Sequence, residues 1–83
     1  MKTFKLASGN HELEIRASWW SGWEDVLYDA RVVSEKRSFI FTTCHSFRVT
    51  EDGEEVTYEV EVLSGIGLGY IARRNGLVFS HHP

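Results

Sequence analysis

Apolar and polar residues alternate along most of this chain, which is the pattern of strands that bury one face. The alternation is broken by four dipeptides that suit two-residue hairpin turns. These are Gly9-Asn10, Asp29-Ala30, Asp52-Gly53 and Asn75-Gly76. Asn-Gly and Asp-Gly are strong hairpin signals, because a type I′ turn needs positive φ at both central residues. Helical periodicity is absent, and no convincing sequence repeat is found.

The turns and the alternation together predict eight strands joined by short connections. The predicted strands span residues 2–8, 11–20, 24–29, 31–36, 38–50, 54–63, 66–74 and 77–82. Short strands linked in this way predict an all-β fold, an antiparallel meander of seven to eight strands that forms a small β-sandwich or flattened barrel. Residues 1–83 form a single domain in this prediction. A bend near Thr42-Thr43 is expected to pass the longest strand from one sheet to the other.

Each turn also predicts which residues lie opposite one another. The Gly9-Asn10 turn pairs Leu6 with Leu13 and Phe4 with Ile15, and it sets Lys5 opposite Glu14. A one-residue slip would place Leu6 against a glutamate, so the turn and the pattern agree.

The Asp52-Gly53 turn predicts a longer hairpin of the same kind. The predicted inward pairs of this hairpin are Val49 with Val56, Phe47 with Tyr58, His45 with Val60 and Thr43 with Val62. Its other face carries Arg48 among glutamates and is expected to be solvated.

The remaining two turns predict shorter pairings. Asn75-Gly76 predicts the pairs Ala72 with Phe79, Tyr70 with His81 and Arg73 with Val78. Asp29-Ala30 predicts Leu27 opposite Val32 and Val26 opposite Val33. It is the weakest turn, because alanine resists positive φ, and we expect an irregular turn or a bulge there.

Composition limits the classes of partner and the location. The formal net charge is −3, and no cluster of lysine and arginine exceeds a pair, so no nucleic-acid-binding surface is expected. No apolar run approaches a membrane span. The single cysteine, Cys44, rules out an internal disulfide and fits a reducing compartment. We therefore expect a cytoplasmic protein.

Several segments resemble the C-terminal β-sandwich domain of the Fas apoptotic inhibitory molecule and small bacterial proteins with the same pattern. The matching segments are Ser21-Gly22, Val26-Leu27-Tyr28-Asp29, Glu35-Lys36 before Phe39, Tyr58 to Gly65, Tyr70 and Arg74-Asn75-Gly76. The resemblance covers most of residues 11–80, and it departs at Ala30, where that family has glycine. It implies a compact antiparallel sandwich that acts through protein contacts, with no catalytic residues to carry over.

The segment Trp19 to Trp23 is the strongest candidate for a binding surface. Continued alternation places Trp19 in the core, whereas Trp20 and Trp23 flank a Ser-Gly turn and have no inward assignment. Exposed tryptophans are typical of interface hot spots and of sugar-binding platforms. Two interpretations stay open, a plug over the end of the sandwich and a contact site formed by Trp20, Trp23 and the nearby Tyr28.

Other chemistry is less well supported. Cys44 and His45 are neighbours on a strand, so their side chains point to opposite faces and cannot form a dyad. The four histidines match no zinc spacing, and His81 and His82 are expected at a frayed end.

Two further segments have ordinary structural interpretations. The glycine-rich run Gly65 to Gly69 precedes a strand and not the helix N-terminus of a phosphate loop. The acidic tip from Glu51 to Glu55 is expected to be solvated.

The sequence therefore favours a non-catalytic protein-interaction module with no cofactor and no metal, whose partner is another protein. A binder of a small carbohydrate or apolar molecule, using Trp20, Trp23 and Tyr28, is the alternative. A compact acidic inhibitor with an acidic patch over Glu51–Glu61 is a variant of the first hypothesis. An enzyme is disfavoured, because no acid, base and nucleophile fall on one face. The sequence leaves the oligomeric state open.

Overall fold

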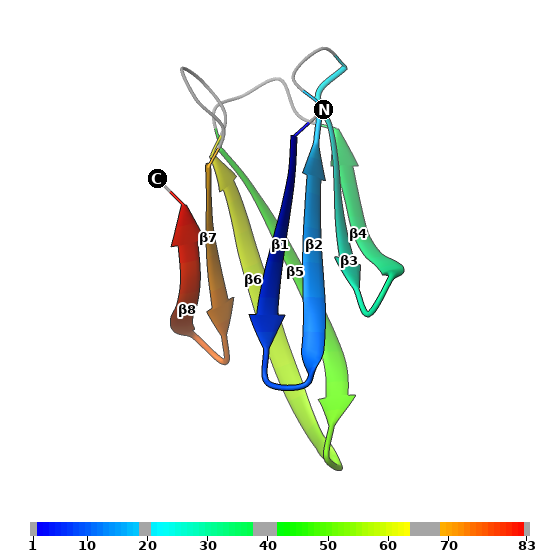
Figure 1. Ribbon diagram of the computed structural model, residues 1–83, viewed down its shortest axis with the longest axis vertical. Helices are drawn as coiled ribbons and strands as arrows, with labels where there is room; N and C mark the ends of the chain where they lie inside the picture. Colours follow the sequence, from blue (N-terminus) through cyan, green and yellow to red (C-terminus); the bar gives the residue numbers. More distant parts are fainter. Residues whose placement is uncertain (1, 19–20, 38–41, 64–68, 83) are drawn as a thin grey trace.

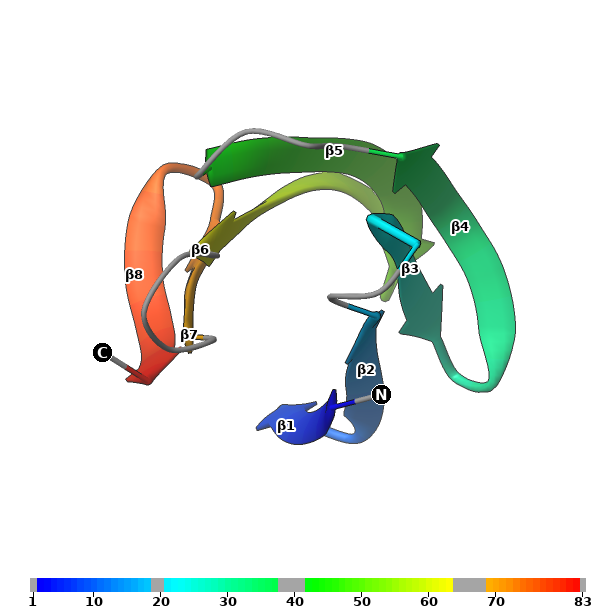
Figure 2. The ribbon, with the colours of Figure 1, turned by 90° about the horizontal axis from the view of Figure 1, so that it is seen from above.

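A computed structural model describes residues 2–18, 21–37, 42–63 and 69–82, and every regular element in these ranges is a β-strand. The strands are β1 (Lys2–Ser8), β2 (His11–Ala17), β3 (Trp23–Tyr28), β4 (Arg31–Arg37), β5 (Thr42–Glu51), β6 (Glu54–Leu63), β7 (Gly69–Arg74) and β8 (Leu77–His82). They form two four-stranded antiparallel sheets with the orders β1-β2-β3-β4 and β5-β6-β7-β8. Figures 1 and 2 show the two sheets facing each other as curved layers. The prediction of a small all-β sandwich is confirmed.

The core lies between the sheets and follows the alternation along the strands. Its buried apolar residues are Phe4, Leu6, Leu13, Ile15, Ala17, Val26, Phe47, Val56, Tyr58, Val60, Val62, Tyr70 and Ala72. The predicted pairings of the β1–β2 and β5–β6 hairpins are all confirmed, including Leu6 with Leu13 and Phe47 with Tyr58. These two registers place the large side chains on the inner faces.

All four predicted turns are two residues long, and they lie at the same end of the sandwich (Figure 1). The expectation of an irregular turn at Asp29-Ala30 is wrong, since both residues adopt positive φ, 47° and 68°, as a type I′ turn requires. The first turn has positive φ only at Gly9, as in type II′. Ala30 therefore takes a left-handed conformation that glycine adopts more easily.

A bulge in the last strand of each sheet changes two predicted registers. Val26 pairs with Ser34 instead of Val33, although Leu27 pairs with Val32 as predicted. In the second sheet, Arg73 pairs with Val78 as predicted, but Ala72 pairs with Ser80 and Tyr70 with His82. The extra residue in β4 or β8 moves the rest of the strand by one position.

Several strand boundaries differ from the prediction. β5 pairs with β6 along its whole length, from Thr42 onward, so the predicted bend at Thr42-Thr43 is wrong and the change of sheet precedes this strand. β2 ends at Ala17, and the predicted core position of Trp19 falls outside the described residues. Of the glycine-rich run, only Gly69 is described, where it begins β7.

The two sheets repeat one plan in detail. The backbone amide of Asp29 donates to the carbonyl of Glu12, 2.8 Å, and the amide of Glu12 donates to the Asp29 carboxylate, 2.9 Å. Asn75 and Thr57 form the same two bonds in the second sheet, 2.8 and 3.0 Å.

The sheets differ in the length of their first hairpin. Leu13 and Tyr58 are equivalent, because they pair with the last residues of β3 and β7. Between Leu13 and its turn, the β1–β2 hairpin has two further residue pairs. Between Tyr58 and its turn, the β5–β6 hairpin has four. The longer hairpin extends past its neighbours at the turn end (Figure 1). Glu51 lies in this extension.

Candidate functional site

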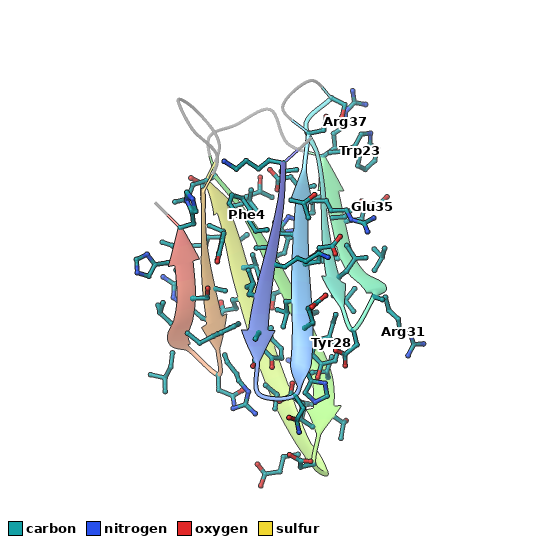
Figure 3. The ribbon with its side chains drawn as sticks, viewed as in Figure 1. Phe4, Trp23, Tyr28, Arg31, Glu35 and Arg37 are labelled. Carbon is teal, nitrogen blue, oxygen red and sulfur yellow. The ribbon has the colours of Figure 1, made fainter. Side chains whose placement is uncertain are left out.

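An exposed tryptophan begins β3 at the end of the sandwich opposite the four turns. The Trp23 residue is 44% exposed. Trp23 pairs with Arg37, the last residue of β4, and the Arg37 guanidinium lies 5.7 Å from the centroid of the indole ring. Both side chains are at the upper end in Figure 3. We call these two residues the Trp23–Arg37 surface.

Hydrogen bonds fix the backbone around this surface. The amide of Ser18 donates to the carbonyl of Trp23, and the amide of Gly22 donates to the carbonyl of Ser18, both at 2.9 Å. Nε of Arg37 donates to the carbonyl of Ser21, also at 2.9 Å. Gly22 has a φ of 76°, which a residue without Cβ adopts at little cost. The indole is thus exposed on a bonded turn that also holds its cationic neighbour.

The structure does not bring the predicted site residues together. Trp20 lies outside the described residues. Tyr28 ends β3 at the turn end of the sandwich, whereas Trp23 begins the strand at the other end (Figure 3). The two side chains also lie on opposite faces of the sheet, since their positions differ by an odd number. Of the two predicted site residues that the structure describes, Trp23 is the exposed one.

Tyr28 belongs instead to a buried polar cluster around Glu51. The Glu51 residue is 8% exposed, so the expectation that the whole acidic tip is solvated is wrong for this residue. Its Oε2 accepts hydrogen bonds from the hydroxyls of Tyr28, 2.7 Å, and Tyr58, 2.6 Å. Its Oε1 accepts from Nη2 of Arg74 at 2.9 Å. Both carboxylate oxygens are therefore satisfied by strands of the two sheets.

The cluster changes the acidity of its members. Burial alone would raise the pKa of Glu51, but hydrogen bonds from Tyr28, Tyr58 and Arg74 outweigh it and lower the pKa to about 2. Burial and the hydrogen bond to Glu51 raise the pKa of Tyr28. Glu51 is thus a charged, fully bonded link between the sheets.

A polar cavity of about 390 Å³ adjoins this cluster between the first and third turns. Its lining residues are Ser8, Gly9, Asn10, His11, Glu51, Asp52 and Arg74. Nδ1 of His11 lies 2.7 Å from the Asp29 carboxylate, and this hydrogen bond raises the pKa of the imidazole. The basic side chains at the cavity, Arg74 and His11, each bond to a carboxylate, so we do not assign an anion-binding site to this cavity.

A second buried polar chain crosses between the sheets beside the hydrophobic core. The His45 residue is 0% exposed, in agreement with its predicted inward position. Nδ1 of His45 lies 2.8 Å from Oγ of Ser34, and Nε2 lies 3.0 Å from Oε1 of Glu24. Cys44 is exposed on the other face, as the alternation predicts.

Serine, histidine and glutamate are the residue types of a hydrolase triad, but a triad also needs access to substrate. The His45 ring has no exposed surface, and the polar cavity beside Glu51 is not lined by Ser34, His45 or Glu24. The arrangement joins β3 and β4 to β5 through a fully bonded imidazole. We interpret it as a structural link.

Within the described ranges, no group of three or more histidine, cysteine, aspartate or glutamate side chains could hold a metal ion. No helix in the described parts of the chain is long and apolar enough to span a membrane. The acidic patch proposed for an inhibitor is also interrupted, because Glu51 is buried and Glu61 pairs with Arg73 at 2.7 Å.

Sequence reasoning missed the role of Arg37 in this site. The predicted strand ended at residue 36, one position too early. Arg37 also lies opposite Trp23 only because the bulge in β4 shifts the register of the β3–β4 pair by one residue.

Comparisons with protein-family models, with curated proteins and with solved structures found no match for this chain.

Proposed function

We propose that the protein is a non-catalytic protein-interaction module whose contact surface is the Trp23–Arg37 surface. The observation that carries the proposal is a tryptophan that is 44% exposed while the backbone around it is held by hydrogen bonds. Tryptophan and arginine are enriched among the residues that dominate binding energy at protein interfaces. The partner is a second protein that covers this indole.

The geometry favours a protein partner because the surface is organised before binding. Arg37 is bonded to the carbonyl of Ser21 and lies over the indole, so fewer rotamers are lost when a partner binds. The same cation occupies the space above the ring that a flat sugar would need. Together with the distance of Tyr28 from Trp23, this argues against the small-ligand alternative.

The resemblance to the domain of the Fas apoptotic inhibitory molecule supports the same type of function, and membership of that family stays a prediction. The cytoplasmic location also stays a prediction from the composition.

The test is a comparison of captured proteins between matched variants. The tagged protein, Trp23→Ala and Val32→Ala would each be used to capture partners from a cell extract, followed by mass spectrometry. Val32 is the control because it is an exposed apolar residue on the same sheet, 55% exposed. We expect a partner that is retained by Val32→Ala and lost by Trp23→Ala. The proposal is wrong if Trp23→Ala is folded by circular dichroism and captures the same proteins as the unmodified chain.

A further inference from the structure

One of the two edge strands of the second sheet, β8, has no charged side chain of the usual protective kind. β8 is the last strand in the order of its sheet and pairs with β7. Residues Leu77–His82 include no aspartate, glutamate, lysine or arginine. Leu77 is 75% exposed and Val78 is 51% exposed. Edge strands are ordinarily protected by charges, proline or bulges, because unpaired backbone groups invite another strand. β8 has a bulge at Phe79 but neither a lysine, arginine or carboxylate nor a proline between Leu77 and His82.

The two edge strands of the first sheet differ in this respect. β4 occupies the equivalent place in the first sheet, and it carries Arg31, Glu35, Lys36 and Arg37. Nζ of Lys36 donates to the carbonyl of Cys44 in β5, 2.6 Å, which covers part of this edge. β1 carries Lys2 and Lys5. A second copy pairing with β4 about its central residue would oppose Arg31 to Arg37, a destabilising pair of like charges.

The outer and inner faces of β8 are complementary to those of an antiparallel β8 from a second copy. Val78 and His81 both line an apolar cavity of about 310 Å³ on the outer face. Its other lining residues are Leu63, Tyr70, Ile71 and Arg73. On the inner face, the Phe79 ring lies 5.8 Å from that of Tyr58, and Ser80 Oγ lies 2.8 Å from the Tyr70 hydroxyl.

A two-fold antiparallel pairing keeps these faces together. The bulge at Phe79 leaves Phe79 and Ser80 both on the inner face, between Val78 and His81 on the outer face. Val78 of one copy then falls opposite His81 of the other, and Phe79 falls opposite Ser80, so outer residues meet outer residues and inner meet inner. No like charges oppose each other at any position of Leu77–His82 among the lysine, arginine, aspartate and glutamate side chains. An isologous interface requires this self-complementarity.

We propose that β8 pairs with β8 of a second copy to form a two-fold dimer. The two second sheets then become one continuous sheet, and the apolar cavities beside Val78 meet across the seam. The Trp23–Arg37 surface lies on the other sheet, so the dimer and the proposed partner contact are independent.

Sedimentation equilibrium over about 1 µM to about 1 mM protein tests the dimer. We expect a reversible monomer–dimer equilibrium for the unmodified chain. Val78→Lys should raise the dimer dissociation constant at least about ten-fold, because it places two cations at the seam. Val32→Lys is the matched control, at the equivalent exposed position of β4, and should leave the constant within about two-fold.

Two further measurements keep the proposal testable if Val78→Lys fails to fold. Leu77→Lys changes a more exposed residue and should also weaken the dimer, and the β8 amides of the unmodified chain should exchange with solvent more slowly at high protein concentration. An unmodified chain that stays monomeric over the whole range would overturn the proposal and leave this edge to an extended segment of another protein. A dimer that Val32→Lys weakens as much as Val78→Lys would also overturn it.

Discussion

The first sheet, β1 to β4, and the second sheet, β5 to β8, share strand order, a type I′ turn before the last strand and a bulge after it. Their side chains differ at equivalent places. Asp29-Ala30 forms the turn in one sheet and Asn75-Gly76 in the other, and the charged edge β4 corresponds to the neutral edge β8. Hydrogen bonding and turn geometry therefore define the backbone plan that the two sheets share, while the side chains at the edges and ends determine what each sheet can contact.

The largest change in stability is expected from a substitution in the longer first hairpin of the second sheet. Glu51→Gln should destabilise the protein by about 3 kcal/mol at neutral pH, because the charge that accepts bonds from Tyr28, Tyr58 and Arg74 is lost. Urea unfolding measures the effect. Asp52→Asn, at the exposed neighbouring position, is the control and should change stability by less than about 0.5 kcal/mol.

The same variant should also remove a pH dependence. The pKa of Glu51 is lowered from 4.5 to about 2 on folding, so its contribution is complete above pH 4.5 and is lost as the pH falls toward 2. The unmodified protein should therefore lose about 3 kcal/mol more than Glu51→Gln over this interval. Equal losses in the two proteins would contradict the buried link.

Ser34 and Ser80 occupy equivalent positions in the two sheets, but Ser34 bonds to a fully buried side chain and Ser80 to one that is less completely buried. Ser34→Ala leaves Nδ1 of the fully buried His45 without its partner and should cost about 2 kcal/mol. Ser80→Ala removes a bond to the Tyr70 hydroxyl in a partly buried place and should cost about 1 kcal/mol or less. Thermal or urea unfolding of both variants measures the difference, and a larger loss for Ser80→Ala would reverse our assignment of the more important link.

The two type I′ turns can be exchanged in both directions. Ala30→Gly should stabilise the protein by about 1 kcal/mol, because residue 30 has a φ of 68°. Gly76→Ala should destabilise it by a similar amount, since Gly76 has a φ of 84° and a new Cβ would meet open space, so backbone strain is the main effect. Changes of the same sign in the two variants would show that the turns are not equivalent.

Asp29→Asn gives the first sheet the residue type that the second sheet has at the equivalent position, Asn75. It should have the smallest effect on stability. The amide oxygen can still accept from the backbone of Glu12, as Asn75 accepts from Thr57. The hydrogen bond to Asp29 raises the pKa of His11, so that pKa should fall in the variant. In the unmodified protein, the raised pKa of His11 contributes stability below pH 6.5 that is lost as the pH rises through the folded value. An NMR titration of His11 measures both proteins, and an unchanged pKa would contradict this pairing.

The alternation predicted the β1–β2 and β5–β6 registers because polar residues separate the apolar ones on both sides of each turn. It failed after the last turn of each sheet. Val32-Val33 and Leu77-Val78-Phe79 are consecutive apolar residues, so a shift by one still buries an apolar side chain and nothing in the pattern marks the bulge.

The buried polar links were only partly visible in the sequence. The alternation that places Phe47 and Val49 inward also places Glu51 inward, so its burial had a signal that its acidic neighbours obscured. Its bonds to Tyr28 and Arg74 join residues 23 positions away along the chain on either side, and no local pattern specifies such contacts. The exposure of Trp23 likewise depends on the hydrogen bonds that Ser18 makes with Trp23 and Gly22.

The meander order has a consequence for how the chain reaches this structure. Among the described strands, every hydrogen-bonded pair joins neighbours in sequence, and none of these strands belongs to both sheets. Each sheet can therefore form by successive closure of hairpins between strands that are adjacent in sequence. Such local contacts favour rapid folding. The contacts that Glu51 and His45 make across the core require both halves, so we expect them to form late, when two preassembled sheets dock.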